Sequence, residues 1–247
     1  MRAAFIALVC ALSLPAGAIL IRADRDDAEY LELATKYVPS VSIAPVDAEG
    51  VLIAPSWVLT SARVARTLEG RKNVTIDGKS YKLKSVHPHP TADIGLLFLG
   101  SGYRNADLDF EPARLYRAAD EGGKTVVIVG HGANGKIGSP LARDSSDHKK
   151  RAAVNTIDRL GNREFDLGIK PADQASDLQG ALGAGDFGGP AFVETKEGLL
   201  VAGIATSANG EWQTYVRVST FVSWIEATMV DAARRDLDEL LDGFGRN

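Results

Sequence analysis

Short apolar segments separated by turn residues dominate the middle of the chain. Between residues 51 and 218, the β-prone runs are 51–54, 57–60, 74–76, 81–87, 94–99, 125–130, 152–158, 191–193, 199–205 and 215–218. Strands this short at this spacing are typical of antiparallel barrels or sandwiches, not of alternating strands and helices. Asp77-Gly78 and Asn209-Gly210 lie between such runs and predict tight hairpin turns. We therefore expect an all-β body.

Two segments with helical periodicity flank this body. Residues 26–33 carry acidic side chains first and apolar ones later, which favours a short helix. In residues 220–241, apolar positions recur at three- and four-residue spacing with charged residues between them. This pattern predicts one long amphipathic helix near the C-terminus.

The first eighteen residues have the layout of a secretory signal peptide. Met1-Arg2 precedes an apolar run, and Ala16-Gly17-Ala18 matches the small-residue pattern of a cleavage site. We therefore expect residues 1–18 to be removed and residues 19–247 to form a single secreted or periplasmic domain. The apolar run is too short to span a bilayer, so we expect no membrane anchor. Cys10 is the single cysteine, and the mature chain is thus expected to lack disulfides.

Composition narrows the class of partner. Hydrophobic residues make up 45% of the chain and charged residues 24%, which is ordinary for a globular protein. The formal net charge is −4 and no basic stripe is visible, so nucleic acid is not an expected partner. His87 and His89 are interpreted as structural loop residues, and we expect no cofactor and no bound metal. The sequence does not determine the oligomeric state.

Four motifs lie in register along the chain. They are Gly-Asp-Phe-Gly-Gly-Pro at 185–190, Gly-Val-Leu-Ile-Ala-Pro-Ser-Trp-Val-Leu-Thr-Ser-Ala-Arg at 50–63, Ala-Asp-Ile-Gly-Leu-Leu at 92–97, and the segment 215–225 that leads into the predicted helix. Together they resemble the trypsin-like serine proteases (peptidase family S1), and the chain resembles their bacterial, disulfide-free members. The resemblance covers residues 50 to 225. It implies two six-stranded antiparallel β-barrels, a site in the cleft between them and a C-terminal α-helix.

The resemblance places residues of the wrong chemistry at two triad positions. Arg63 stands at the position of the general base, Phe187 at that of the nucleophile, and Asp93 at that of the orienting acid. Phenylalanine has no nucleophilic atom, and an arginine side chain stays protonated and accepts no proton. Loss of either residue of such a unit lowers turnover by about six orders of magnitude. The triad is therefore degenerate, with only Asp93 retained.

Asp93 and two neighbours of the triad positions allow more than one interpretation. Asp93 is interpreted as a structural carboxylate paired with Arg63 in preference to a catalytic one, because a charge in a cleft wall needs a partner. Ser61 is a conceivable substitute nucleophile, but no base lies next to it in the sequence. His131 lies where the family has a Gly-Trp-Gly turn and is interpreted as a packing residue.

The same resemblance assigns the oxyanion loop. Gly185 and the main-chain N–H of Phe187 match the family's oxyanion donors. Asp186 stands where the family pairs an aspartate with a new N-terminal amine, which here would belong to Ile19. Alternatively, Asp186 caps N–H groups of its own loop.

The specificity pocket is assigned by register from Phe187. Ala181 lies at its base, and Thr206, Ser207 and Ala208 resemble its wall. Without an acidic residue at position 181, a preference for basic side chains is not expected.

Three functions are compatible with these observations. The leading hypothesis is a secreted pseudoprotease that binds a protein or peptide in the former active-site cleft. The family resemblance keeps a serine-type endopeptidase as the main alternative. The third is a degenerate relic without a ligand.

Overall fold

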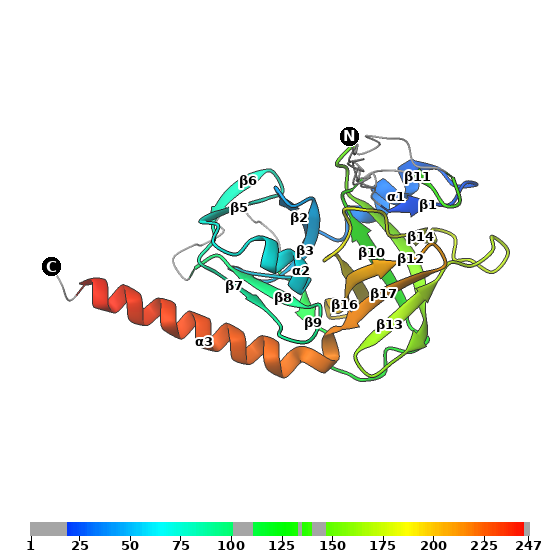
Figure 1. Ribbon diagram of the computed structural model, residues 1–247. Coiled ribbons are helices and arrows are strands. Elements are labelled where there is room, and N and C mark those ends of the chain that lie inside the picture. Colours follow the sequence, from blue (N-terminus) through cyan, green and yellow to red (C-terminus); the bar gives the residue numbers. More distant parts are fainter. Residues whose placement is uncertain (1–18, 101–110, 133–134, 140–146, 245–247) are drawn as a thin grey trace, which may run out of the picture.

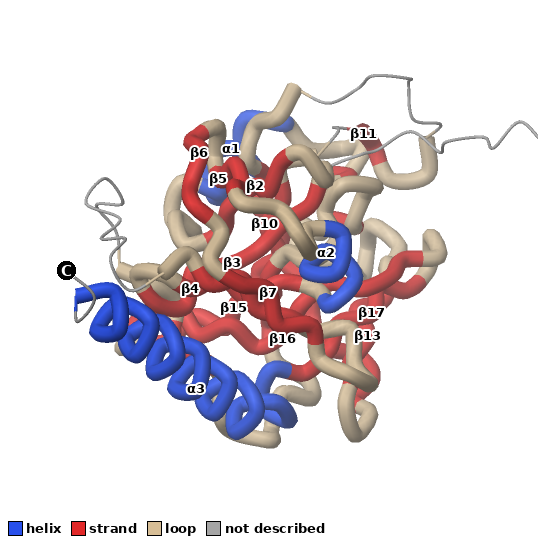
Figure 2. The backbone as a smooth tube through the Cα atoms, turned by 60° about the vertical axis from the view of Figure 1, so that its left-hand side comes forward, coloured by secondary structure: helices blue, strands red, loops and turns tan. Residues whose placement is uncertain are grey.

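A computed structural model of the chain describes residues 19–100, 111–132, 135–139 and 147–244. It contains two large, mostly antiparallel β-sheets that lie side by side, with a long helix along one side of both (Figures 1 and 2). The predicted fold class, an all-β protein of the trypsin-like two-barrel type with a C-terminal helix, is confirmed, although only one of the two sheets closes into a six-stranded barrel.

The first sheet has seven strands in the order β6-β5-β2-β3-β4-β8-β7. The strands are β2 (Ser40–Ala44), β3 (Ala48–Ala54), β4 (Trp57–Thr60), β5 (Asn73–Ile76), β6 (Lys79–Lys82), β7 (Ser85–Pro88) and β8 (Gly95–Phe98). The predicted hairpin turn at Asp77-Gly78 joins β5 to β6, and both turn residues have positive φ, 46° and 76°. Within the described residues β6 and β7 are not paired, so this sheet is a half-barrel and not the closed six-stranded barrel expected.

The second sheet closes into a barrel. Its strands are β9 (Arg114–Leu115), β10 (Thr125–Gly130), β12 (Arg151–Leu160), β13 (Glu164–Gly168), β15 (Pro190–Thr195), β16 (Gly198–Ala208) and β17 (Trp212–Arg217). Their order is β15-β10-β12-β13-β17-β16-β9, and an additional pairing of β15 with β16 closes a ring of six strands. The predicted turn at Asn209-Gly210 joins β16 to β17.

Alternation along the strands explains the apolar runs of the sequence. In β10, Val126 and Ile128 face the interior of the second barrel, whereas Val127 and Val129 face the core between the two sheets. Both faces of such a strand are buried, so its sequence is apolar at consecutive positions. The same holds around β8, where Leu96 and Phe98 belong to the core between the sheets, and Leu97 and Leu99 to that of the first sheet.

The helices in the described part of the chain are α1 (Asp27–Ala34), α2 (Ala62–Thr67) and α3 (Val218–Phe244). The first matches the predicted 26–33 segment, because Asp26 forms a capping box with Glu29. The last matches the predicted 220–241 helix and runs under both sheets, with its C-terminal turns beyond the first sheet (Figure 1). No helix among the described residues has the length and apolarity needed to cross a membrane.

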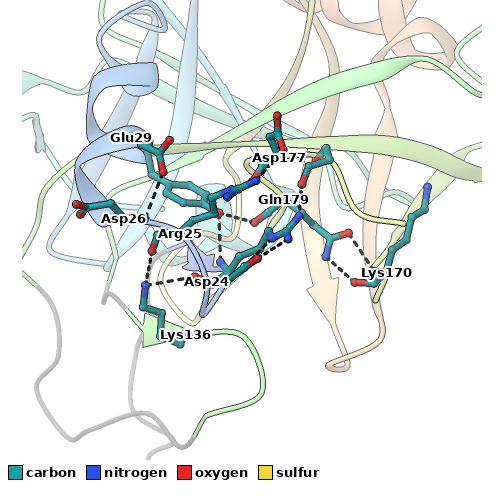
Figure 3. A network of polar contacts seen from close by, with 11 residues as sticks. Asp24, Arg25, Asp26, Glu29, Lys136, Lys170, Asp177 and Gln179 are labelled. Atoms are coloured by element: carbon teal, nitrogen blue, oxygen red, sulfur yellow. Dashed lines mark hydrogen bonds and ion pairs between the residues drawn. The ribbon is translucent and has the colours of Figure 1, made fainter. Parts of the chain in front are cut away.

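The N-terminal arm is bound to the second barrel. β1 (Leu20–Ile21) forms a small sheet with β11 (Gly135–Lys136) and β14 (Gly180–Ala181). Figure 3 shows the polar contacts that hold this arm: Lys136 Nζ donates to the carbonyl oxygen atoms of Arg22 and Arg25 at 3.2 and 2.8 Å. The Tyr30 hydroxyl donates to the carbonyl of Gln179 at 3.0 Å.

Arg151, whose side chain is fully buried, provides a second attachment of the arm. Its guanidinium group donates two hydrogen bonds to Asp27 of α1, at 2.6 and 2.8 Å, and two to Asp147, at 2.8 and 2.9 Å. Because a buried arginine needs its donors satisfied, Arg151 binds both carboxylates, and its two bonds to Asp27 hold α1 against β12.

Candidate active site

The loop 183–189 between β14 and β15 depends on its glycines. Gly185 and Gly188 have φ values of 100° and 89°, which side-chain-bearing residues rarely adopt. A Cβ atom on Gly188 would lie 2.3 Å from both the carbonyl oxygen of Glu49 and Oγ1 of Thr60. The loop therefore needs glycine at both positions, which flank Asp186 and Phe187.

Phe187 is held between the two sheets. Its carbonyl oxygen accepts a hydrogen bond of 3.0 Å from the main-chain N–H of Glu49 in β3. The next residue, Gly188, donates to the carbonyl of Ala205 in β16 at 2.8 Å. The position of Phe187 is thus fixed by main-chain contacts to both sheets, which do not depend on its side chain.

Arg63 connects the other two triad positions. It lies in the first turn of α2, and its main-chain N–H donates to Oδ1 of Asp93 at 2.8 Å. Its Nη2 atom lies 3.5 Å from Oδ2 of Asp93. The carbon of the same guanidinium group lies 5.1 Å from the centroid of the Phe187 ring. The structure therefore brings Arg63, Asp93 and Phe187 together, as the motifs predicted.

The same guanidinium group also reaches the predicted pocket wall. Nη2 of Arg63 donates a 2.6 Å hydrogen bond to the main-chain carbonyl of Thr206 in β16. This contact spans 143 residues of sequence and was not predicted. Arg63 thus lies across the space between α2 and β16.

The Arg63–Asp93 ion pair is partly solvated. The two side chains are 55% and 29% exposed. Pairs of this kind contribute about 0–1 kcal/mol, and a cation–π contact near the surface adds about 0.5–1 kcal/mol. The pair is therefore not the buried charge pair whose disruption costs several kcal/mol.

Asp186 is completely buried. Its Oδ2 accepts from the N–H of Gly183 at 2.9 Å, and its Oδ1 from that of Gly132 at 3.4 Å. Burial, and next the nearby Glu49 carboxylate, raise the pKa of Asp186 well above its usual range. The loop-capping role is the one that these contacts support. The side chain of Ile19 is buried against the second barrel beside Gly180, and an ion pair between its amine and Asp186 stays a prediction.

A buried pair, Glu49 and His131, lies next to the oxyanion loop. Oε2 of Glu49 lies 2.9 Å from Nδ1 of His131, and Oε1 accepts from the main-chain N–H of His131 at 2.9 Å. Both residues line a small cavity of about 130 Å³ that also contacts Gly185. His131, interpreted from the sequence as a packing residue, is thus bonded to Glu49, which lies two residues before the predicted apolar run 51–54 and carries no sequence signal of its own.

The predicted specificity-pocket residues lie in two segments, β14 and the end of β16, and the side chain of Gln213 connects them. Ala181 is 7% exposed and pairs with Leu20 of β1 in the small sheet. Ala208 pairs with Gln213 in the β16–β17 ladder. The Gln213 amide accepts from the N–H of Leu182 at 2.7 Å and donates to the carbonyl of Gly180 at 3.2 Å, so it contacts both sides of Ala181. Of the predicted wall residues, Thr206 is buried, and Ser207 and Ala208 are exposed.

An open hollow of about 670 Å³ adjoins Arg63 and Asp93. It is lined by Arg63, Arg66, Thr67, Pro90, Thr91, Ala92 and Asp93. Phe187 and Ala181 are not among its lining residues. The hollow therefore lies between α2 and the loop 90–93, on the side of the first sheet.

The remaining candidates have structural contacts. The Ser61 hydroxyl caps α2 by accepting from the N–H of Val64 at 3.2 Å. His89 packs edge-on against Phe221 and Trp224 of α3, and the Oγ of Ser85 lies 2.8 Å from Nε2 of His87. In the described part of the chain, no group of three or more His, Cys, Asp or Glu side chains is arranged to hold a metal ion.

The family of the protein follows from a comparison of its sequence with family models. Residues 48–202 match the family model of the trypsin-like peptidase domain, which is more than half of the chain. The chain belongs to this family. Its motifs, its closed second barrel and the convergence of Arg63, Asp93 and Phe187 all agree with that membership.

Proposed function

We propose that this trypsin-like domain is a catalytically inactive pseudoprotease that binds a protein or peptide outside the cytoplasm. The support comes from chemistry at the triad positions. The ring of Phe187 has no atom that attacks a carbonyl, and a protonated guanidinium group at position 63 cannot remove a proton. The signal-peptide layout of residues 1–18, which lie outside the described residues, supports export.

One observation carries the proposal: a single guanidinium group contacts Asp93, the Phe187 ring and the carbonyl of Thr206. In the triad mechanism, a neutral base must stand between the nucleophile and the acid. Here a cation occupies that place, with an ion pair to Asp93 on one side and a cation–π contact to the Phe187 ring on the other. The guanidinium group at the base position thus makes contacts of its own and is not merely a missing function.

Binding, in contrast to turnover, needs only a shaped surface. The glycine-dependent loop at 185–189 is retained, and Ser207 and Ala208 on β16 are exposed beside Arg63. Function in this fold resides in loops and strand ends carried on a rigid scaffold. A peptide segment that contacts Arg63, Phe187 and the exposed end of β16 is the proposed ligand class.

The test combines a reaction probe with a binding screen on the exported protein. A fluorophosphonate probe should leave the protein unlabelled, and a mixed peptide library should be retained without cleavage. Arg63→Ala and Phe187→Ala should each reduce retention. Arg66→Ala is the matched control, because Arg66 lies on the same helix and bonds the carbonyl of His89 instead. Labelling or cleavage by the unmodified protein would reject inactivity, and retention unchanged in both site variants would reject this surface.

The alternative is a serine-type endopeptidase. Membership of the trypsin-like peptidase family favours it. It requires a nucleophile other than residue 187, and Ser61, the closest candidate in sequence, uses its hydroxyl to cap α2. Cleavage of library peptides that survives Ser61→Ala and Phe187→Ala would place the chemistry elsewhere.

A further inference from the structure

The turn 130–132 at the end of β10 lies between two buried carboxylates. The main-chain N–H of His131 donates to Oε1 of Glu49 at 2.9 Å, and that of Gly132 donates to Oδ1 of Asp186 at 3.4 Å. Glu49 is 2% exposed and Asp186 0%. One acid belongs to β3 and the other to the loop 183–189 that leads into β15. Acids from two distant segments therefore hold consecutive N–H groups of one turn.

The same two acids fix the loop. The main-chain N–H of Glu49 donates to the carbonyl of Phe187 at 3.0 Å, and the carboxylate of Asp186 also caps an N–H group within the loop. The middle of the loop lies directly on the turn, because a Cβ atom on Gly185 would be 3.4 Å from Cα of Gly132. The position of the loop thus depends on the contacts around both carboxylates.

Neither carboxylate is bonded to a permanent cation. In the described ranges of the chain, no lysine or arginine nitrogen lies within 4 Å of either one. The partner of Glu49 that can carry a charge is the imidazole of His131, whose Nδ1 lies 2.9 Å from Oε2. Lys150 donates to a main-chain carbonyl instead, and Arg151 is bonded to two other carboxylates.

Other titratable side chains around the pair are acids, a histidine and a tyrosine. Asp77 lies 3.9 Å from Nε2 of the same imidazole, and Asp47 and His148 line the adjoining cavity. Burial, and next the charge of Asp186, raise the pKa of Tyr215 well above its ordinary value, so its hydroxyl stays neutral. These side chains bring no permanent positive charge to the pair.

Two carboxylates in one buried space resist ionising together. Burial raises the pKa of Glu49, and burial followed by the charge of Glu49 raises that of Asp186. The closed arrangement therefore binds protons more tightly than one in which water reaches the pair. Rising pH favours the hydrated arrangement by up to about tenfold per pH unit for each proton released. An amine of Ile19 at Asp186 would neutralise that acid alone and leave Glu49 to titrate.

We propose that Glu49 and Asp186 make the loop 183–189 a pH-dependent switch, which is closed in acid, as in this structure, and opens when both carboxylates ionise. Water reaches the pair through the cavity of about 130 Å³ that Glu49, His131 and Gly185 line. Opening separates Gly185 from the turn and hydrates both carboxylates.

The switch regulates the ligand surface, and this consequence rests on the proposed function. Phe187 and the loop that carries it belong to the proposed peptide-binding surface, and the closed loop holds that surface in one arrangement. Peptide should therefore be retained more strongly at about pH 5 than at about pH 8. The loop movement needs no ligand, so the two are tested separately.

Hydrogen–deuterium exchange of the exported protein tests the movement. The protection factor, which is the intrinsic amide exchange rate divided by the measured one, removes the ordinary pH dependence of exchange. The protection factors of residues 183–189 should fall at least about tenfold between about pH 5 and about pH 8. They should also stay below those of β12 at each pH, because the loop opens without unfolding of the barrel.

Glu49→Gln keeps a neutral polar group beside His131 at every pH. It should reduce the fall to about threefold or less, because a lone ionised Asp186 meets no like charge. Asp47→Asn is the matched control, since Asp47 is an exposed acid that lines the same cavity. Asparagine tolerates the positive φ of 45° at this position, so the variant should keep the full fall. Should Glu49→Gln fail to fold, Asp186→Asn removes the other charge and should have the same effect.

Three results would overturn the switch. They are protection that does not change with pH, loop protection equal to that of β12 at every pH, and a fall that Glu49→Gln leaves unchanged. A flat profile with retained peptide rejects the switch and leaves the proposed function intact. A falling profile with no peptide retained at any pH supports the switch and rejects the proposed function. Equal retention at both pH values beside a falling profile would overturn the regulation of binding.

Discussion

The main-chain N–H and the guanidinium group of Arg63 both bind the carboxylate of Asp93, at 2.8 and 3.5 Å. Arg63 lies in the first turn of α2, where an anion is favourable because the helix N-terminus exposes unpaired N–H groups. Asp93 therefore stabilises the start of this helix, in addition to its ion pair. Asp93 thus has a structural contact that needs no catalysis.

This relationship predicts different costs for the two partners. Asp93→Ala removes both contacts and should lower the free energy of unfolding by about 1–2 kcal/mol. Arg63→Ala keeps the main-chain N–H and should cost about 0–1 kcal/mol. Urea unfolding of both variants measures the difference. A loss of about 3–5 kcal/mol for either variant would mean that the pair is buried, contrary to its exposure.

Placing histidine at position 63 and serine at position 187 should produce weak esterase activity. The nucleophile and the base act as one unit, so Arg63→His with Phe187→Ser is needed, and either change alone should give almost nothing. Hydrolysis of an activated ester by the double variant is the readout, and Arg63→His with Phe187→Ala is the control that lacks a nucleophile. If the unmodified protein already shows saturating hydrolysis that Phe187→Ser leaves untouched, the inactive interpretation is wrong.

Glu49 should make stability depend on pH. Burial raises the pKa of its carboxyl group above the ordinary value near 4.5. The folded protein then holds this proton more tightly than the unfolded chain, so the contribution is complete below that ordinary value and is lost as the pH rises through the raised one.

Glu49→Gln tests this dependence because it keeps a neutral polar group at every pH. The free energy of unfolding of the unmodified protein, relative to that of Glu49→Gln, should fall as the pH is raised from about 4.5 toward neutrality. Urea unfolding at several pH values measures it, with the exposed Glu211→Gln as control. Parallel pH profiles for the two proteins would contradict a raised pKa.

The exported protein should begin at Ile19. Cleavage after Ala18 leaves Ile19 and Ile21, whose side chains are 0% and 4% exposed in the second barrel's core. N-terminal sequencing decides the point. A start beyond Asp24 would remove β1 from its place beside Ala181, and it would exclude any role for an Ile19 amine.

Elements with a repeating local pattern could be predicted from the sequence. Consecutive apolar residues predicted the buried strands β8 and β10, Asp77-Gly78 predicted its turn, and periodicity predicted α3 within a few residues. β2 was missed, because its Ser-Val-Ser-Ile-Ala sequence is short and half polar. β13 was missed for a similar reason, since Phe165 and Leu167 are its two buried positions.

Only some contacts of the candidate site could be predicted from the sequence. The motifs placed Arg63 near Asp93, because the family resemblance fixes both positions. The bond from Arg63 to the Thr206 carbonyl and the pair of Glu49 with His131 join residues 143 and 82 positions apart. Neither pair belongs to a motif, so tertiary structure alone brings them together.

The second barrel needs residues that lie outside the segment matched by the family model. The family match ends at residue 202, inside β16, and omits β17, which pairs with both β13 and β16 to complete the ring. It also begins at residue 48 and omits β2, which joins β3 to β5. A fragment cut at these limits would expose unpaired edges in both sheets, and such edges favour aggregation. The smallest fragment in which both sheets keep all their strands is therefore longer than the segment that matches the family model.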